Sequence, residues 1–276
     1  MDEELGEQDG EKKPRRVRKV VAWTAAVLVV VAAAIYIIFG LIYDDSTTPV
    51  AVDDVVESFR EAQAEAERSA GHLPAPGVYV YATTGDESVD ALGGTTHDYP
   101  ATTTITVSSA GCGVRVRWDA LVERYEDWQL CDDEGALVAT GYTTFHKFFG
   151  QDDRRDLTCE EPLLLVPAEP AVGDTWSGRC AEGTFDEVFT VSVRGLETVD
   201  VGGEAVEAVH VHLDMVIESP TDDPTGGTTT DLWIATEDRM ILRWDEATDT
   251  TAGSFVGPVR LQETYGLTLT DLAPRA

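Results

Sequence analysis

The sequence predicts a mainly β protein: an N-terminal single transmembrane helix, then one extracytoplasmic antiparallel curved sheet, half-barrel or barrel-like, with one amphipathic helix. Two patterns predict this fold class. Beyond position 77, apolar and polar residues alternate over roughly ten stretches, as in half-buried strands. Turn-forming Gly, Asp, Pro and Thr separate these stretches, and no helical pattern lies between them. That arrangement is typical of an antiparallel sheet.

The segment 20–43 contains no charged residue. As a helix its 24 residues would extend about 36 Å, enough to cross a hydrocarbon core of about 30 Å. Six basic residues precede it, and Asp44 and Asp45 follow it. The positive-inside rule then leaves a tail, 1–19, in the cytoplasm and places the rest outside. A signal peptide cleaved near Ala34 is the alternative, but the apolar run continues to Tyr43, which favours an uncleaved anchor.

The exported part begins with a linker, 44–52, and a predicted helix, 53–69. Its first turn, Asp54-Val-Val-Glu57, resembles a capping box with Asp in place of Ser or Thr. A narrow apolar stripe favours partial packing of this helix on the sheet, although a stalk is the alternative; the stripe consists of Val55, Val56, Phe59 and Ala62. No linker divides the remainder, so we expect one extracytoplasmic β-rich domain over 53–276.

Strict alternation gives each predicted strand one apolar face. It is clearest in 205–218, where Val209, Val211 and Leu213 alternate with polar residues, and in 258–270. Further strands are predicted near 78–84, 101–108, 113–119, 124–131, 136–145, 186–194, 229–235 and 240–246. A helix of about 16 residues spans only about 24 Å and cannot cover them all. The sheet must therefore curl on itself, and a groove can remain inside it.

Four cysteines follow the apolar segment: Cys112, Cys131, Cys159 and Cys180. An even number in an exported domain predicts two disulfides. We favour the local pairing, Cys112–Cys131 and Cys159–Cys180, at about 3 kcal/mol for each loop; the other two pairings remain open.

Each of these pairings makes a further prediction. The first would set Trp118 opposite Tyr125 and Arg117 opposite Glu126 in a hairpin. The second would close the segment 162–167 into a loop, whose residues Leu163 to Val166 form buried core or an exposed contact patch.

The chain carries a formal net charge of −31, all of it beyond residue 19 because the tail holds six bases and six acids. Such a field repels phosphate backbones, which excludes nucleic acid as a partner. A solvated surface is the simplest interpretation. Divalent cations or a basic partner protein are the alternatives.

Common catalytic and nucleotide-binding motifs are absent, so we predict no enzyme, catalytic residue or cofactor. One group of residues could hold Zn²⁺: His210, His212 and Asp214 share a strand face at spacings of about 7 Å. His146 or His97 would supply a further ligand. A polar solvent-facing side of the strand explains the same pattern more simply, so we predict no metal site.

A membrane anchor, a helix and a run of strands with disulfides are similar to bacterial extracytoplasmic proteins of the LolA/LolB-like kind. The resemblance covers about 53–272 and includes a late hairpin, in which Asp231-Leu-Trp turns into a strand ending at Arg243. It implies a half-closed sheet around a helix that binds lipid or acyl chains. The uncleaved anchor and the disulfides depart from those soluble carriers. A different family of anchored envelope proteins is the alternative.

We therefore expect a non-enzymatic, single-pass, membrane-anchored domain that acts as an interaction or assembly partner in the cell envelope. Binding of a lipid or other hydrophobic ligand in the curled sheet is the first alternative. A metal-dependent enzyme that uses His210 and His212 is the second. A cavity inside the sheet would favour the ligand, and a filled core would favour the protein partner.

Overall fold

The computed structural model describes residues 30–31, 45–63, 72–221, 223–254 and 257–276. The chain forms two compact units, 1–44 and 45–276. In the first unit, Val30 and Val31 are helical, while the predicted tail and the remainder of the predicted segment 20–43 lie outside the described residues. No helix among the described residues has the length and apolar character needed to cross a membrane. The anchor stays a prediction.

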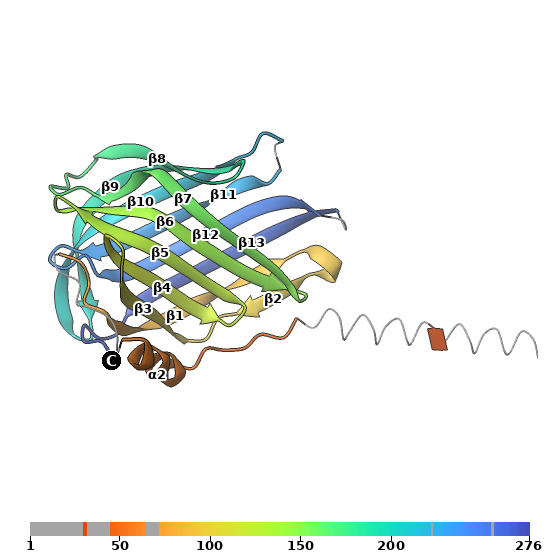
Figure 1. The fold of residues 1–276 in the computed structure, drawn as a ribbon, viewed down its shortest axis with the longest axis horizontal. Helices are drawn as coiled ribbons and strands as arrows, with labels where there is room; N and C mark the ends of the chain where they lie inside the picture. Colours follow the sequence, from red (N-terminus) through yellow and green to blue (C-terminus); the bar gives the residue numbers. More distant parts are fainter. Residues whose placement is uncertain (1–29, 32–44, 64–71, 222, 255–256) are drawn as a thin grey trace, which may run out of the picture. The chain divides into compact units, whose positions relative to one another are not determined.

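The described residues of the second unit form one α-helix, one short 3-10 helix and thirteen strands (Figure 1). The helices are α2 (Val52–Gln63) and η1 (Ala91–Gly93). The strands are β1 (Gly77–Val89), β2 (Thr95–Asp98), β3 (Thr102–Ala110), β4 (Gly113–Leu121), β5 (Arg124–Asp133), β6 (Ala136–Phe148), β7 (Gln151–Val166), β8 (Thr175–Glu182), β9 (Phe185–Val201), β10 (Glu204–Glu218), β11 (Thr225–Ala235), β12 (Ile241–Ser254) and β13 (Gly257–Leu269).

The strands close into an antiparallel barrel. From β3 to β13, each strand pairs with the next one along the chain, and β1 pairs with β3. The second half of β1 pairs with β13, from Tyr81 opposite Leu269 to Val89 opposite Leu261. Twelve strands thus form the ring, and short β2 pairs with the end of β1. The prediction that the sheet curls on itself is confirmed, and the pairing of β13 with β1 closes the sheet completely.

Where a strand alternates, its apolar face points into the barrel, as predicted. Val209 and Val211 of β10 are buried in the core. The largest buried side chains form an aromatic cluster in which the Trp118 and Tyr265 rings lie 4.3 Å apart and the Trp244 and Tyr265 rings 5.7 Å apart. Burial of such rings is a major source of stability, because each removes a large apolar area from water.

Helix α2 packs against the outside of the barrel, over β1 and β3 (Figure 1). Val56 and Phe59, two members of the predicted stripe, are buried with Val78 in a small separate cluster. The predicted helix is confirmed for Val52–Gln63, and its continuation to residue 69 lies outside the described residues. The arrangement differs from a half-closed sheet wrapped around a helix, because the barrel is closed and this helix is external.

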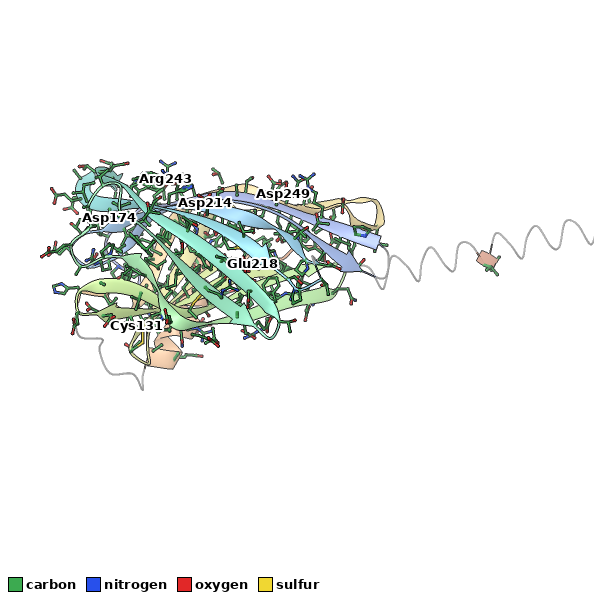
Figure 2. All side chains as sticks on the ribbon, turned by 90° about the horizontal axis from the view of Figure 1, so that it is seen from above. Cys131, Asp174, Asp214, Glu218, Arg243 and Asp249 are labelled. Atoms are coloured by element: carbon green, nitrogen blue, oxygen red, sulfur yellow. A yellow bond between two sulfur atoms is a disulfide. The ribbon has the colours of Figure 1, made fainter. Side chains whose placement is uncertain are left out.

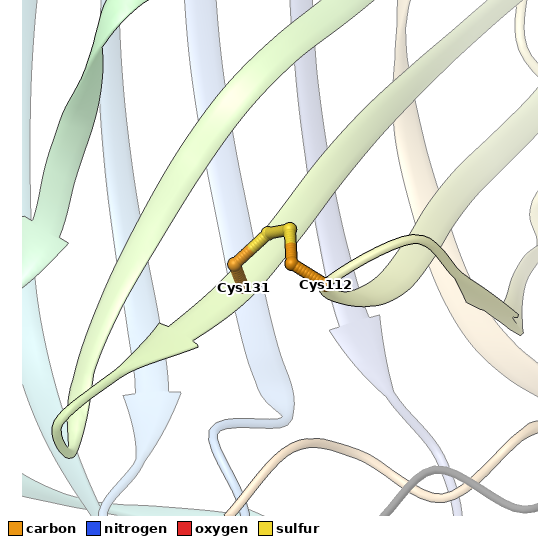
Figure 3. Close-up of a disulfide and its surroundings, with 2 residues drawn as sticks. All are labelled: Cys112 and Cys131. Carbon is orange, nitrogen blue, oxygen red and sulfur yellow. A yellow bond between two sulfur atoms is a disulfide. The ribbon is translucent and has the colours of Figure 1, made fainter.

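Both disulfides join the cysteines that the local pairing predicts, Cys112 to Cys131 and Cys159 to Cys180. Cys112 lies in the turn between β3 and β4 (Figure 3). The second disulfide joins β7 to β8, whose ladder contains a single register pair, Thr158 opposite Ala181, directly beside the cysteines. A covalent bond therefore ties the barrel together where its strand pairing is shortest.

The register predicted for the β4–β5 hairpin is wrong by one residue. Trp118 lies opposite Glu126, and Arg117 lies opposite Asp127. Gly113, rather than Cys112, is the ladder partner of Cys131, because Cys112 belongs to the turn. One residue of shift decides which side chains face each other across the ladder.

The segment 162–167 is also not the predicted loop. Strand β7 runs through it to Val166, and Leu163, Leu165 and Val166 are buried. The interpretation of this segment as core is confirmed. Strands β2, β7 and β8 lie outside the predicted strand ranges, because their residues lack a clear alternation of apolar and polar side chains.

Candidate functional site

His210, His212 and Asp214 alternate along β10 with its buried apolar residues and therefore lie on its outer face, where the two histidines are half-buried and Asp214 is exposed. Figure 2 labels Asp214. His210 Nδ1 lies 2.8 Å from Glu197 Oε1, and its Nε2 lies 2.7 Å from Asp231 Oδ1. His212 Nδ1 lies 3.0 Å from the same Asp231 oxygen. Within the described residues, no three His, Cys, Asp or Glu side chains are arranged to hold a metal ion. These histidines belong to a network of ion pairs on the outer surface.

The other two histidines considered as ligands meet around Glu87 on β1, away from His210 and His212. His97 Nδ1 lies 3.0 Å from Glu87 Oε1, and His146 Nδ1 lies 2.7 Å from Glu87 Oε2. His97 Nε2 lies 3.0 Å from Asp45 Oδ2, and its ring stacks on Phe148. Glu87 is fully buried, and His97 nearly so. This buried chain of charges ties residue 45 to the barrel.

The electrostatics of the Glu87 cluster favour its ionised form. Burial raises the pKa of Glu87, but the hydrogen bonds to His146 and His97 and the nearby cations outweigh burial and hold this pKa at about 2. Burial lowers the pKa of His97, but its hydrogen bonds and charge interactions with Glu87 and Asp45 prevail and raise it. At neutral pH the cluster therefore contains ionised Glu87, which together with Asp45 shifts the His97 pKa upward.

A partly open cavity of about 150 Å³ lies inside the barrel, lined by residues of β5 to β7 and of β9 to β13. Its apolar wall includes Leu213, Met215 and Leu232, and its polar wall carries Thr228 and Thr230 from β11. Aromatic side chains complete the lining; they are Trp128, Tyr142, Phe185, Phe189 and Trp244. The volume is about ten times what one water molecule requires. This part of the barrel is hollow, unlike the packed aromatic cluster.

A buried arginine organises the charges of the cavity wall. Arg124 Nε lies 2.8 Å from Glu263 Oε1, and its Nη2 lies 3.0 Å from Glu126 Oε2. Arg124, Glu126 and Glu263 are each at most 3% exposed. Tyr99 donates a hydrogen bond to Glu263, and Trp128 donates one to Glu126. One arginine thus neutralises only one of the two carboxylates that it binds.

Glu187 also lines the cavity but has no such partner. It is 7% exposed, and its Oε2 makes no hydrogen bond within the described part of the chain. Burial, reinforced by the negative charge of Glu126, raises the pKa of Glu187 to about 8. A buried polar atom without a partner costs about 1–3 kcal/mol. At neutral pH Glu187 is therefore held mainly as the neutral acid.

Glu246 on β12 is the fourth glutamate of the cavity. Thr230 donates a hydrogen bond of 3.1 Å and Trp244 one of 3.2 Å, both to Oε2. The side chain lines the cavity and is half-buried. Burial raises its pKa well above the usual value, and the negative charges of Glu126 and Glu263 add to this effect. Glu187 and Glu246 together give the cavity two carboxyl groups without an ion-pair partner among the described residues.

The cavity residues were not among the predicted site residues, although the sequence contains a signal for them. Glu187 and Glu263 occupy the apolar phase of their strands, between Phe185 and Phe189 and between Leu261 and Tyr265. A carboxylate at an inward-facing position of a strand indicates either a buried network or a binding site.

Comparisons with known proteins add little to this description. No family model matches the chain, and no curated protein matches it. A crystal structure of the hypothetical lipoprotein YmcC from Escherichia coli (K12) matches at 11% identity and a TM-score of 0.29, covering 76% of this chain and 95% of that chain. Similarity at this level supports no conclusion about fold or function.

Proposed function

We propose that the protein binds a small, partly apolar organic ligand inside its barrel. The observation that carries this proposal is the cavity of about 150 Å³, which combines apolar and aromatic walls with Glu187, a buried carboxyl group that has an unpaired oxygen. Binding pockets typically combine apolar walls with a few polar groups that orient the ligand. A hollow left without function would cost stability, because its walls lose packing contacts.

The size of the cavity narrows the ligand class. A cavity of about 150 Å³ accommodates a molecule the size of benzene, whereas pockets for drug-sized ligands measure about 300–1,000 Å³. A small molecule therefore fits better than the full acyl chain implied by the resemblance to lipid carriers. The four glutamates of the wall also favour a ligand that carries at least one polar group.

We propose further that this domain is displayed on the outer side of the cell membrane by an anchor at 20–43. The support is the uncharged segment with bases before it and acids after it, together with disulfides Cys112–Cys131 and Cys159–Cys180. Disulfides persist in oxidising compartments. The hollow core favours a bound ligand over a protein partner. The role of an assembly partner in the envelope stays a prediction.

Ligand binding can be tested with a neutral probe, benzyl alcohol, on the full-length chain in lipid nanodiscs. The indole N–H groups of Trp128 and Trp244 line the cavity, whereas that of Trp233 lies on the outer face. We expect benzyl alcohol to shift the first two indole NMR signals and to leave the Trp233 signal in place, with empty nanodiscs as the blank.

A matched pair of variants checks where the probe binds. Thr228 lines the cavity, and its neighbour Thr229 is exposed on the outer face. Thr228→Phe fills the cavity and should abolish the shifts, while Thr229→Phe should keep them. Equal behaviour of the two variants, or no shift in the wild-type protein, would overturn the proposed function.

A further inference from the structure

Among the described residues that line the cavity, acidic groups outnumber basic ones. Five carboxyl groups and two arginines line it. Both arginines already have partners: Arg124 binds Glu126 and Glu263, and Arg155 binds Asp153 at 3.1 Å. The histidine of the wall, His146, binds Glu87 instead. The cations of the wall are therefore paired with other acids. Among the described residues, the carboxyl groups that line the cavity without an ion-pair partner are those of Glu187 and Glu246.

From this arrangement we infer that the ligand is an organic cation, an amine with an apolar body, whose ammonium group binds between Glu187 and Glu246. The inference rests on the proposed function, because it names the class of ligand for the same cavity. The unpaired Oε2 of Glu187 is the acceptor that the protein leaves free for the ammonium group. Thr230 and Trp244 both donate to Oε2 of Glu246.

The aromatic lining suits the same ligand. Trp128 stacks on Tyr142 with ring centroids 4.3 Å apart, and Trp244 faces the same cavity. Aromatic faces attract cations as well as apolar groups, and the attraction strengthens where water is excluded. The net charge of −31 adds a long-range field that draws cations to the molecule. An anionic ligand would instead meet the excess negative charge of Glu126 and Glu263, which share a single arginine, and this charge disfavours it.

Binding of a cation must also move a proton. Glu187 is held mainly as the neutral acid at neutral pH, with a pKa of about 8. An ammonium group beside it favours the carboxylate, so the proton on Glu187 passes to the buffer as the ion pair forms. A neutral ligand has no such effect. Proton release is therefore a specific signature of the inferred ion pair.

The test compares three probes of similar size on the full-length chain in nanodiscs at pH 7: benzylamine as its cation, benzyl alcohol, and benzoate. We expect the cation to bind about tenfold or more tightly than benzyl alcohol, because charged hydrogen bonds contribute about 1.5–3 kcal/mol, and benzoate to bind most weakly. Calorimetry in two buffers of different ionisation enthalpy should show proton release with the cation and none with the alcohol.

Two neighbouring variants localise the effect. Glu187→Gln should reduce the preference for benzylammonium over benzyl alcohol about tenfold. Asp186→Asn makes the same change from carboxyl to amide one residue away, where Asp186 pairs with Arg179 on the outside, and should keep the preference. Glu187→Gln protein that still binds benzyl alcohol shows that the variant is folded.

The outcomes separate the two claims. If benzyl alcohol binds but the cation binds no better and releases no proton, the ligand is not a cation, and the proposed function stands. If benzoate binds most tightly, the inference is likewise overturned. If benzyl alcohol does not shift the Trp128 and Trp244 signals, the proposed function fails, and the inference that rests on it fails as well.

Discussion

Arg124 on β5 and Glu263 on β13 form a buried ion pair across the barrel interior, with 2.8 Å between Nε and Oε1. The two residues are 139 positions apart in the chain and at most 2% exposed. Their strands are not neighbours in the sheet, so the contact spans the interior. Arg124 sets the charge of the cavity wall because it pairs with Glu126 and Glu263. Among the described residues, Glu187 and Glu246 then have no ion-pair partner.

Arg124→Met should lower the free energy of unfolding by about 3–5 kcal/mol, since it leaves Glu126 and Glu263 as buried charges without a partner. Arg154→Met is the control. Arg154 pairs with Asp156, both about half exposed, and solvent screens such a pair, so its loss should cost little. Urea unfolding of both variants measures the difference, and equal losses would contradict the buried network.

Replacing Glu187 changes how stability depends on pH. The folded-state pKa of about 8 lies above the ordinary value of 4.5, so the folded protein keeps a proton that the unfolded chain loses. Stability from this group is therefore full below pH 4.5 and falls as pH rises to about 8. Glu187→Gln mimics the protonated acid and avoids this loss. Thermal melts from pH 5 to 9 should show an advantage of the variant that grows to about pH 8 and then levels off.

Glu87 should show the opposite dependence. Its folded pKa of about 2 lies below 4.5, so its contribution is present above pH 4.5 and is lost as pH falls toward 2. Glu87→Gln should destabilise the protein by about 3 kcal/mol at neutral pH, because His97 and His146 lose a buried charged partner. The difference from the wild type should shrink in acid. A difference that is constant from pH 7 to pH 3 would show that Glu87 is not ionised in the fold.

The two disulfides should differ in where their loss is felt. Replacing Cys159 and Cys180 by Ala should cost about 3 kcal/mol and should also expose the amides of β7 and β8 to hydrogen exchange, because a single ladder pair joins those strands. Replacing Cys112 and Cys131 should leave β4 and β5 protected, since their ladder is continuous over most of its length. If hydrogen exchange at β7 and β8 were no faster in the first variant than in the second, the idea of a weak junction between these strands would be contradicted.

Much of the fold follows from local pattern. The alternation around Val209 and Val211 predicts which face of the strand is buried. Because the apolar face must be covered while the polar face stays in water, the sheet has to curl on itself. Strand β7 could not be predicted this way, because its first half, 151–156, is mostly exposed on both faces and carries charges in both phases. The hairpin register failed for a different reason: Cys112 lies in the turn, which a spacing of cysteines cannot reveal.

The candidate site depends on contacts that no local pattern contains. Arg124 meets Glu263 only because β13 pairs with β1 and closes the ring. His97 lies opposite Glu87 in the β1–β2 ladder, and His146 reaches the same carboxylate from β6, a strand that does not pair with β1. What the sequence does contain is a glutamate at an inward position, at Glu187 and again at Glu263. That signal marks a site without identifying its ligand.

The most direct test of ligand binding is native mass spectrometry of the full-length protein extracted from the membranes of cells that produce it naturally. A barrel that holds a ligand should carry a small molecule in stoichiometric amount, retained by Thr229→Phe and lost from Thr228→Phe. A wild-type protein of bare polypeptide mass, which also fails to take up any small molecule from an extract of the same cells, would contradict the account.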